Sequence, residues 1–360
     1  MTKAFIETQE GVALYHQSIA LYEKIERENA HTININGITL GYLEFGSSDG
    51  TPLVWVHGSG STSYEIVNVQ AGLVEAGYRV IAIDYRGHGK TQIDMTDHNT
   101  SLYHIADDIA ALLDRLDIAK AIVGGLSKGG WVAAAFYDTY PKRVLGLLLE
   151  DGGSFSKVRL IEDIQLKVIQ PGPSPYPAEE LKKLYDPAIR FHTRLEGLKA
   201  VWAAYSPAVN ANSTVEYITL MLSYLREKAD GRWAYHCDGQ WLFLGDGREI
   251  ETGSTGATLY SRLPLMQQSQ ELMIPFVVFR NLNVPVHIID PDSPVDWLPV
   301  RHQNEALQAL HPDLIVHEVY DYKHSPHEAH IERPERFIES AKALLKRVKE
   351  RENENICSRS

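Results

Sequence analysis

The sequence has little cysteine, no long apolar run and no excess of basic residues. Its two cysteines, Cys237 and Cys357, provide no disulfide framework, and no Cys/His spacing typical of a metal site occurs. No apolar stretch approaches the roughly 20 residues that span a bilayer. The formal net charge of −12 argues against a nucleic-acid partner, because such partners favour a basic surface.

Other absences narrow the functional class. Neither a glycine-rich phosphate loop nor an H-E-x-x-H zinc motif occurs, so we expect no cofactor and no metal. The first residues lack the apolar core of a signal peptide. We therefore expect a cytoplasmic protein with a small-molecule substrate and no membrane partner. The composition leaves open whether the chain forms a homo-oligomer.

The most informative stretch that is present is the G-x-S-x-G motif at 125–129, centred on Ser127. An apolar run suited to a buried strand precedes it at 119–124, and a helix-forming run follows at 130–137. This context predicts a nucleophile elbow, in which a sharp strand-to-helix turn lifts the serine hydroxyl above the sheet edge. The turn is too tight for side chains at its flanks, which explains the small residues two before and two after the serine.

Apolar runs alternate with helical stretches over much of the chain. The strand candidates are 52–56, 77–83, 119–124, 144–149, 284–289 and 314–319. Unbroken apolar strands that alternate with helices indicate a parallel sheet covered on both faces. The fold class predicted is therefore α/β, with a doubly wound, mostly parallel sheet.

The pattern divides the chain into five segments. They are an N-terminal helical extension (1–30) packed on the core, a first core segment (31–154), a mainly helical cap insertion (155–280), a second core segment (281–350) and a frayed polar tail (351–360). Asn36-Gly37 predicts a hairpin between 31–35 and 38–44. Within the aromatic-rich cap, a second hairpin is predicted over 233–251, turning near 238–239 or 246–247.

Several motifs, taken in order, resemble those of the α/β-hydrolase superfamily over about 36–150 and 284–345. They are the H-G turn at 57–60, the D-x-R-G-x-G turn at 84–89, the elbow at 125–129, the strand at 285–289 and the H-x-x-H-x-E-x-P ending at 327–334. The resemblance implies the α/β-hydrolase fold and a Ser, acid, His order of catalytic residues along the chain.

In that reading Ser127 is the nucleophile and a C-terminal histidine is its general base. His327 keeps the family's spacing to Glu332 and Pro334, and His324 is the alternative. Neither follows the glycine that usually precedes the family's catalytic histidine. His330 is expected to pack at the start of the last helix.

Four carboxylates are candidates for the acid of the triad: Asp290, Asp292 and Asp296 in the loop at 290–296, and Asp151. Asp292, Asp296 and Asp151 are ranked, in that order. Asp292 is ranked first, because it follows the strand at 285–289, where the family places its acid; Asp296 lies in the same loop. Asp151, just after the preceding strand, is ranked third, since some members of the family place the acid there. Asp151-Gly152-Gly153 is equally typical of a simple turn.

An oxyanion hole needs two N–H groups directed at the developing negative charge. The N–H of Lys128 is one, as the residue after the nucleophile. The N–H of Ser59 is the second, with Gly60 as the alternative. His57 is expected to stabilise this loop by hydrogen bonding. Three further polar residues are interpreted as structural, on a helix surface or in a turn: Glu65, Arg86 and His88.

These residues predict a serine hydrolase of the carboxylesterase or lactonase type, cleaving an ester or lactone of a medium-sized, hydrophobic or aromatic small molecule. A serine at the elbow disfavours epoxide hydrolase and haloalkane dehalogenase chemistry, since the resembling enzymes use aspartate there. The alternatives are a C–C bond or amide hydrolase with the same triad, and a non-hydrolytic ligand-binding or acyl-transfer member. A C–C hydrolase would need a carboxylate site, for which Arg190 and Arg194 are available.

Overall fold

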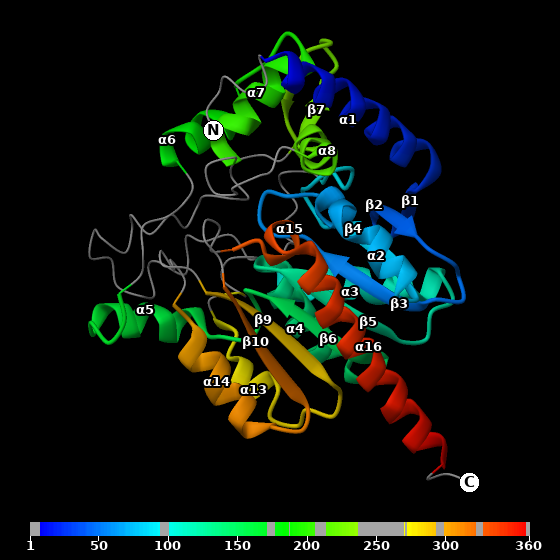
Figure 1. Ribbon diagram of the computed structural model, residues 1–360, viewed down its shortest axis with the longest axis vertical. Helices are drawn as coiled ribbons and strands as arrows, with labels where there is room; N and C mark the ends of the chain where they lie inside the picture. Colours follow the sequence, from blue (N-terminus) through cyan, green and yellow to red (C-terminus); the bar gives the residue numbers. More distant parts are fainter. Residues whose placement is uncertain are drawn as a thin grey trace.

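The computed structural model describes residues 8–93, 101–170, 177–186, 188–205, 214–236, 270, 272–292, 299–321 and 327–357. At its centre is an eight-stranded sheet with the order β1-β2-β4-β3-β5-β6-β9-β10 (Figure 1). β1, β2 and β4 pair antiparallel, and the other neighbouring strands are parallel. The predicted α/β fold class with a mostly parallel sheet is confirmed.

The predicted strands are present, with ends shifted by a few residues. Their bounds are β1 (Ala30–Ile35), β2 (Ile38–Phe45), β3 (Thr51–Val56), β4 (Tyr78–Asp84), β5 (Ala121–Leu126), β6 (Val144–Glu150), β9 (Val286–Asp292) and β10 (Ile315–Asp321). The hairpin between β1 and β2 is confirmed, and both Asn36 and Gly37 adopt positive φ, as a two-residue turn of this type requires.

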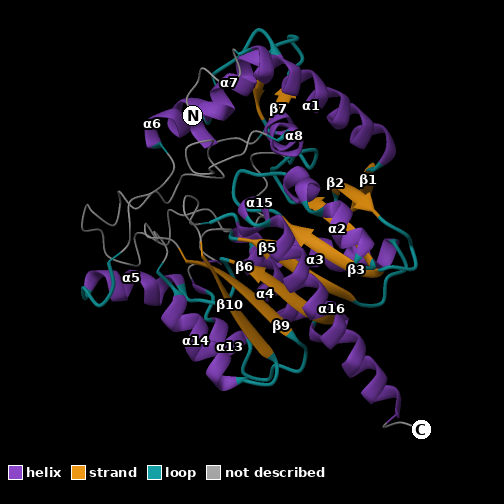
Figure 2. Cartoon of the chain, in the orientation of Figure 1, coloured by secondary structure: helices purple, strands orange, loops and turns teal. Residues whose placement is uncertain are grey.

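Helices cover both faces of the sheet, because alternate residues of each central strand point to opposite faces. Leu53 and Trp55 of β3 pack into the same core as α2 (Gln70–Glu75) and α16 (Pro334–Cys357). Val54 and Val56 pack into a second core on the opposite side. Figure 2 shows helices on both faces of the sheet. The helices of that second core include α3 (Leu102–Arg115), α4 (Lys128–Thr139), α13 (Pro275–Val278) and α14 (Arg301–Leu310).

The chain between β6 and β9 contributes no strand to the main sheet within its described residues. Besides α13, its described elements are α5 (Lys157–Gln165), α6 (Ala178–Leu184), α7 (Arg194–Tyr205), α8 (Val215–Ser223), β7 (Leu225–Glu227) and β8 (Trp233–Tyr235). We call the part from α6 to His236 the cap segment. Trp233–Tyr235 pairs with the preceding Leu225–Glu227, and the second strand of the hairpin predicted over 233–251 lies outside the described residues. The turn sites 238–239 and 246–247 lie outside the described residues.

The N-terminal helix α1 (Gln9–Glu28) confirms the predicted amphipathic helix. It packs along α8, with the hydroxyl of Ser18 donating to the carbonyl of Val215 at 3.1 Å. Its C-terminal half also contacts the first core segment, where Tyr22 stacks on Tyr64 with ring centroids 4.9 Å apart and Ile25 is buried. The helix therefore packs on both the cap segment and the core. At the other end α16 continues to Cys357, where a frayed tail was predicted.

A buried ion pair joins the β1–β2 hairpin, the turn after β4 and helix α3. Asp108 of α3 accepts two hydrogen bonds from the Arg86 guanidinium, at 2.6 and 2.9 Å, and one from the Asn36 side chain at 3.0 Å. Both charged side chains are almost fully buried. The predicted structural role of Arg86 in its turn agrees with this geometry.

We expect Asp108→Asn to lower the free energy of unfolding by about 3 to 5 kcal/mol, because it removes the charge of a buried carboxylate that binds the Arg86 guanidinium. Asp114→Asn on the same helix is the matched control. Its pair with Arg143 is solvent-exposed, so its loss should cost less than about 1 kcal/mol. Urea unfolding of both variants checks this, and equal losses would contradict it.

Candidate active site

Ser127 lies at the junction of β5 and α4 in a backbone conformation that side chains rarely adopt, with φ 50° and ψ −116°. Its N–H donates to the carbonyl of Glu150 at the end of β6, at 2.8 Å. The flanking glycines have no space for a side chain, since a Cβ on Gly125 or Gly129 would lie 2.3 or 1.8 Å from the Val56 carbonyl oxygen. The strained strand-to-helix turn expected of an elbow is therefore present.

Asp151 and His327 form a buried pair beside the elbow. Asp151 directly follows β6, and its Oδ2 lies 2.6 Å from Nδ1 of His327. A carboxylate only accepts hydrogen bonds, so Nδ1 carries the proton and Nε2 of the neutral ring is an acceptor. The next residue, Gly152, packs on the backbone of Ser127, where a Cβ would lie 2.0 Å from the Ser127 carbonyl oxygen.

The environment shifts the pKa of both Asp151 and His327. Burial raises the pKa of Asp151 to about 6, although the hydrogen bond to His327 acts in the opposite direction. Burial alone would lower the pKa of His327, but the hydrogen bond and charge of Asp151 outweigh it, and the pKa is raised. The arrangement favours an ionised carboxylate that stabilises a positive imidazolium.

The other candidates for acid and base are not in this contact within the described structure. The backbone of Asp292 ends β9, in register with Asp321 of β10, and its side chain lies outside the described residues. Asp296 and His324 also lie outside them. Of the three ranked aspartates, the structure thus brings Asp151, the last-ranked one, to His327.

The turn after β3 carries the predicted oxyanion residues. The N–H of Ser61 donates to the carbonyl of Gly58 at 3.3 Å, and Gly60 has φ 75°, which is the geometry of a type II turn over 58–61. The N–H groups of Gly58 and Gly60 donate to Glu65 and His88, at 3.0 and 3.4 Å. Among the hydrogen bonds of the described residues, the N–H of Ser59 donates to none.

Glu65 and His57 are both buried beneath this turn. Glu65 was expected on a helix surface, but it lies in the short helix η2 (Ser63–Asn68) and accepts from the Trp55 indole as well as from Gly58. His57 is fully buried, stacks on Tyr85 and contacts the Gly58 carbonyl through Nδ1, at 2.7 Å. Its expected loop-stabilising role is confirmed.

A second buried pair lies next to the first. His330, in the short helix α15 (Ala329–Glu332), directs Nδ1 and its backbone N–H to the Glu150 carboxylate, at 2.9 and 3.0 Å. Burial would lower the pKa of His330, but the charge of Glu150 outweighs it and raises the pKa to about 9. Two adjacent residues at the end of β6 therefore bind two histidines of one short segment. Sequence reasoning missed Glu150, although an acidic pair after a strand and an H-x-x-H segment signal such pairing.

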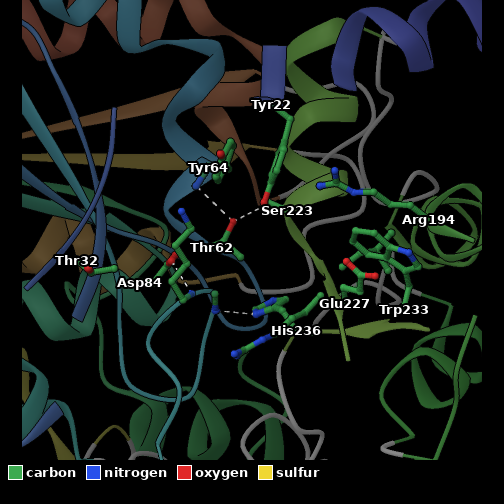
Figure 3. A pocket seen from close by; sticks show the side chains of 14 residues that line it. Tyr22, Thr32, Thr62, Tyr64, Asp84, Arg194, Ser223, Glu227, Trp233 and His236 are labelled. Carbon is green, nitrogen blue, oxygen red and sulfur yellow. Dashed lines mark hydrogen bonds between the residues drawn. The ribbon is translucent and has the colours of Figure 1, made fainter. Parts of the chain in front are cut away.

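The cap segment adjoins a cavity of about 410 Å³ (Figure 3). Its lining includes Tyr22 and Arg194 but none of Ser127, Asp151 or His327. The Arg194 guanidinium lies 4.1 Å over the ring of Tyr22 and 5.0 Å from that of Trp233, so it joins α1 to the cap segment. Arg190, the other predicted cationic candidate, donates to the neighbouring Ile189 carbonyl.

Known proteins share the fold that carries this geometry. The family model described as the alpha/beta hydrolase fold matches residues 51–197. A solved structure of E-2-(acetamidomethylene)succinate hydrolase superposes with a TM-score of 0.58 at 21% identity, covering 88% of this chain and 98% of that one. The chain has the α/β-hydrolase fold. The resemblance inferred from the motifs is confirmed.

Curated relatives of this α/β hydrolase match over a shorter segment. A non-heme chloroperoxidase of Streptomyces lividans is 36% identical over 115 residues. A 2-hydroxy-6-oxononadienedioate/2-hydroxy-6-oxononatrienedioate hydrolase of Escherichia coli O139:H28 is 36% identical over 120 residues. Each match covers 32% of this chain and 41% of the relative, so the chain spans less than half the length of these relatives. No helix in the described part of the chain is long and apolar enough to cross a membrane.

The His330–Glu150 pair generates a pH-dependent stability. With a pKa of about 9 when folded and an ordinary value of 6.5, His330 stabilises the fold fully below pH 6.5, and this contribution is lost as pH rises through 9. We expect the free energy of unfolding to fall by about 3 kcal/mol over that range from this group.

His330→Gln isolates the effect, because lysines and tyrosines that titrate in the same alkaline range remain in both proteins. The decline measured by urea unfolding at several pH values should be smaller in the variant by that amount. Parallel pH profiles for the two proteins would contradict the assignment. The acidic groups that act on His330 are Glu150, Glu65 and Glu328.

Proposed function

We propose that this α/β hydrolase is a serine hydrolase that cleaves an ester or lactone through an acyl-enzyme on Ser127. The observation that supports it is the buried Asp151–His327 hydrogen bond at the strand end that also accepts the Ser127 N–H. A serine hydroxyl is a weak nucleophile without an adjacent base. The hydrogen bond to Asp151 fixes the tautomer of His327, in which Nε2 is the acceptor nitrogen of the neutral ring.

In the proposed reaction Nε2 of His327 accepts the proton of the Ser127 hydroxyl as Oγ attacks the substrate carbonyl. Asp151 stabilises the imidazolium, which then donates that proton to the leaving alcohol. Water, deprotonated by the same histidine, attacks the acyl-enzyme and releases the acid. In this proposal Asp151 replaces Asp292, because Asp151 is the carboxylate in contact with His327.

The oxyanion formed during attack would be stabilised by the N–H groups of Ser59 and Lys128. The N–H groups of Gly58 and Gly60 already have acceptors in Glu65 and His88, which favours Ser59 over Gly60. Lys128 is the first residue of α4, so the positive end of this helix dipole lies at the elbow.

The substrate class proposed is a medium-sized, hydrophobic or aromatic molecule, on the basis of the aromatic-rich chain between β6 and β9. The described aromatics of that region lie mainly in the cap's own interior, among them buried Trp202 and Tyr205. Trp241 and Phe243 lie outside the described residues. The proposal for substrate size therefore rests on the composition of the segment.

C–C bond hydrolysis is the second candidate, favoured by the 36% identity to the Escherichia coli hydrolase. It would use the same triad on a vinylogous diketone acid and would require a group that binds the substrate carboxylate. Arg194 is engaged between two aromatic rings of a cavity that the triad does not line. Product analysis separates the two candidates. Hydrolysis of an ester releases an alcohol, whereas C–C bond hydrolysis of a diketone releases a fragment of its carbon skeleton.

We expect treatment with a fluorophosphonate to add one adduct to the wild-type protein, on Ser127. Intact-protein mass should show no adduct in Ser127→Ala, because the nucleophile is gone, and strongly slowed labelling in His327→Ala, because the base is gone. The kcat of ester hydrolysis should fall by several orders of magnitude in both variants. Unchanged esterase activity in Ser127→Ala would contradict the proposed function, and full labelling of His327→Ala would move the base to His324.

We expect Asp151→Asn to lower kcat by about 10²- to 10⁴-fold while Asp292→Asn stays near wild type. In the wild type kcat/KM should rise with pH as His327 loses its proton, at a pH above its ordinary value of 6.5. Without the Asp151 charge the pKa of His327 falls, so the inflection should move to lower pH in Asp151→Asn.

The pH profile needs one further control. Burial raises the pKa of the neighbouring Glu328 to about 7, so Glu328→Gln tests whether the inflection belongs to His327. A large loss in Asp292→Asn together with an active Asp151→Asn would restore Asp292 as the acid.

A further inference from the structure

The oxyanion turn is held from the cap side by a set of buried side chains. The Gly60 carbonyl accepts two hydrogen bonds, from the Tyr235 hydroxyl and from Nε2 of His236, the latter at 3.1 Å. These donors come from β8 and the residue after it, far from the turn in sequence. Both lone pairs of the carbonyl are thus used, and the plane of the Gly60–Ser61 peptide is fixed.

The protonation of His236 is determined by its contacts. The backbone N–H of Gly89 donates to Nδ1 of His236 at 2.8 Å, a hydrogen bond drawn as the dashed line to His236 in Figure 3. The ring proton therefore lies on Nε2, which is 3.1 Å from the Gly60 carbonyl oxygen. Burial lowers the pKa of His236 to about 3, so the ring stays neutral at physiological pH. His88 accepts the N–H of the same glycine, and Gly60 is therefore bound through both backbone polar groups.

A chain of tyrosine hydroxyls continues from Tyr235 into the cap segment. Tyr205, at the end of α7, lies 2.8 Å from Tyr235, and Tyr185, after α6, hydrogen-bonds to Tyr205. Because Tyr235 donates to Gly60, the direction of the chain is fixed as Tyr185 to Tyr205 to Tyr235 to Gly60. Hydrogen bonds aligned in this way polarise one another.

Two more contacts bind the rest of the turn to α8. The hydroxyl of Thr62 lies 2.6 Å from that of Ser223, and the hydroxyl of Tyr224 donates to Ser61 at 3.1 Å. Each residue from Gly60 to Thr62 is thus hydrogen-bonded to the cap segment. Ser59, which precedes them, carries the proposed oxyanion N–H.

We infer that Tyr235 and His236 are positioning residues that hold the turn so that the Ser59 N–H points at the developing oxyanion. They act through the Gly60 carbonyl and do not touch the substrate. The inference rests on the proposed function, since it assumes an oxyanion at Ser59. It assigns the cap segment a part in transition-state stabilisation, beyond any part in enclosing the substrate.

The experiment compares single hydroxyl deletions within the cap segment. Tyr235→Phe should lower kcat for 4-nitrophenyl acetate about tenfold with KM within about twofold, which is less than the ~10²- to 10³-fold loss typical of removing an oxyanion donor itself. The affinity for phenylboronic acid, whose tetrahedral adduct mimics the oxyanion, should fall by the same factor. Tyr205→Phe, one hydrogen bond further away, should give a smaller loss of the same kind.

Tyr217→Phe is the matched control, because the buried Tyr217 hydroxyl has no hydrogen-bond partner within the described structure. It should leave kcat and boronate affinity unchanged. His236→Gln, whose amide can donate to the same carbonyl, should retain more activity than His236→Ala. If Tyr235→Phe does not fold, as judged by its circular dichroism, the comparison of Tyr205→Phe with Tyr217→Phe tests the inference in its place.

The outcomes distinguish this inference from the proposed function. If the wild type is labelled by a fluorophosphonate at Ser127 and hydrolyses the ester, the function stands. The inference alone is then overturned if Tyr235→Phe, or Tyr205→Phe in its place, matches Tyr217→Phe in kcat and boronate affinity. It is also overturned if the loss appears in KM with boronate affinity retained. If the wild type is neither labelled nor active, the proposed function fails first.

Discussion

The carboxyl end of β6 is the constraint on which the rest of the site depends. Glu150 accepts the Ser127 N–H with its carbonyl and binds His330 with its carboxylate, and Asp151 binds His327. One dipeptide thus joins the elbow to the C-terminal segment that carries both histidines. Because all of these groups are buried, breaking either ion pair would leave an uncompensated charge, and the arrangement persists only as a unit.

The sheet explains why this dipeptide has that position. β6 lies between β5, which leads to the elbow, and β9, and parallel strands present their carboxyl ends at one edge. A residue just after β6 is therefore adjacent to the nucleophile, whereas one after β9 is a strand further away. The difference of one strand position separates Asp151 from Asp292, and both positions satisfy the Ser, acid, His order along the chain.

Local signals in the sequence were sufficient for the strands, the elbow and the hairpin at Asn36-Gly37, since each depends on a few neighbouring residues. These signals were insufficient where a residue's position depends on a partner that is distant in sequence. The amphipathic pattern of α1 predicts that its apolar face is buried, but it does not predict that α8 covers that face. From its neighbours in sequence, Glu65 is expected to be a polar residue on a helix surface. In the structure its carboxylate accepts hydrogen bonds from the Trp55 indole and the Gly58 N–H. The choice between Asp151 and Asp292 is of the same kind.

The two sides of the proposed oxyanion turn are held by different parts of the molecule. Glu65 and His88, from the core, bind the N–H groups of Gly58 and Gly60, while Tyr235 and His236, from the cap segment, bind the Gly60 carbonyl. Committing those neighbouring N–H groups to fixed acceptors leaves the turn one N–H for an anion, and rigid donors need little reorganisation when charge develops. A substitution in the cap segment can therefore alter the geometry of this turn without touching Ser127, Asp151 or His327, because the turn is the structural element that the core and the cap segment share.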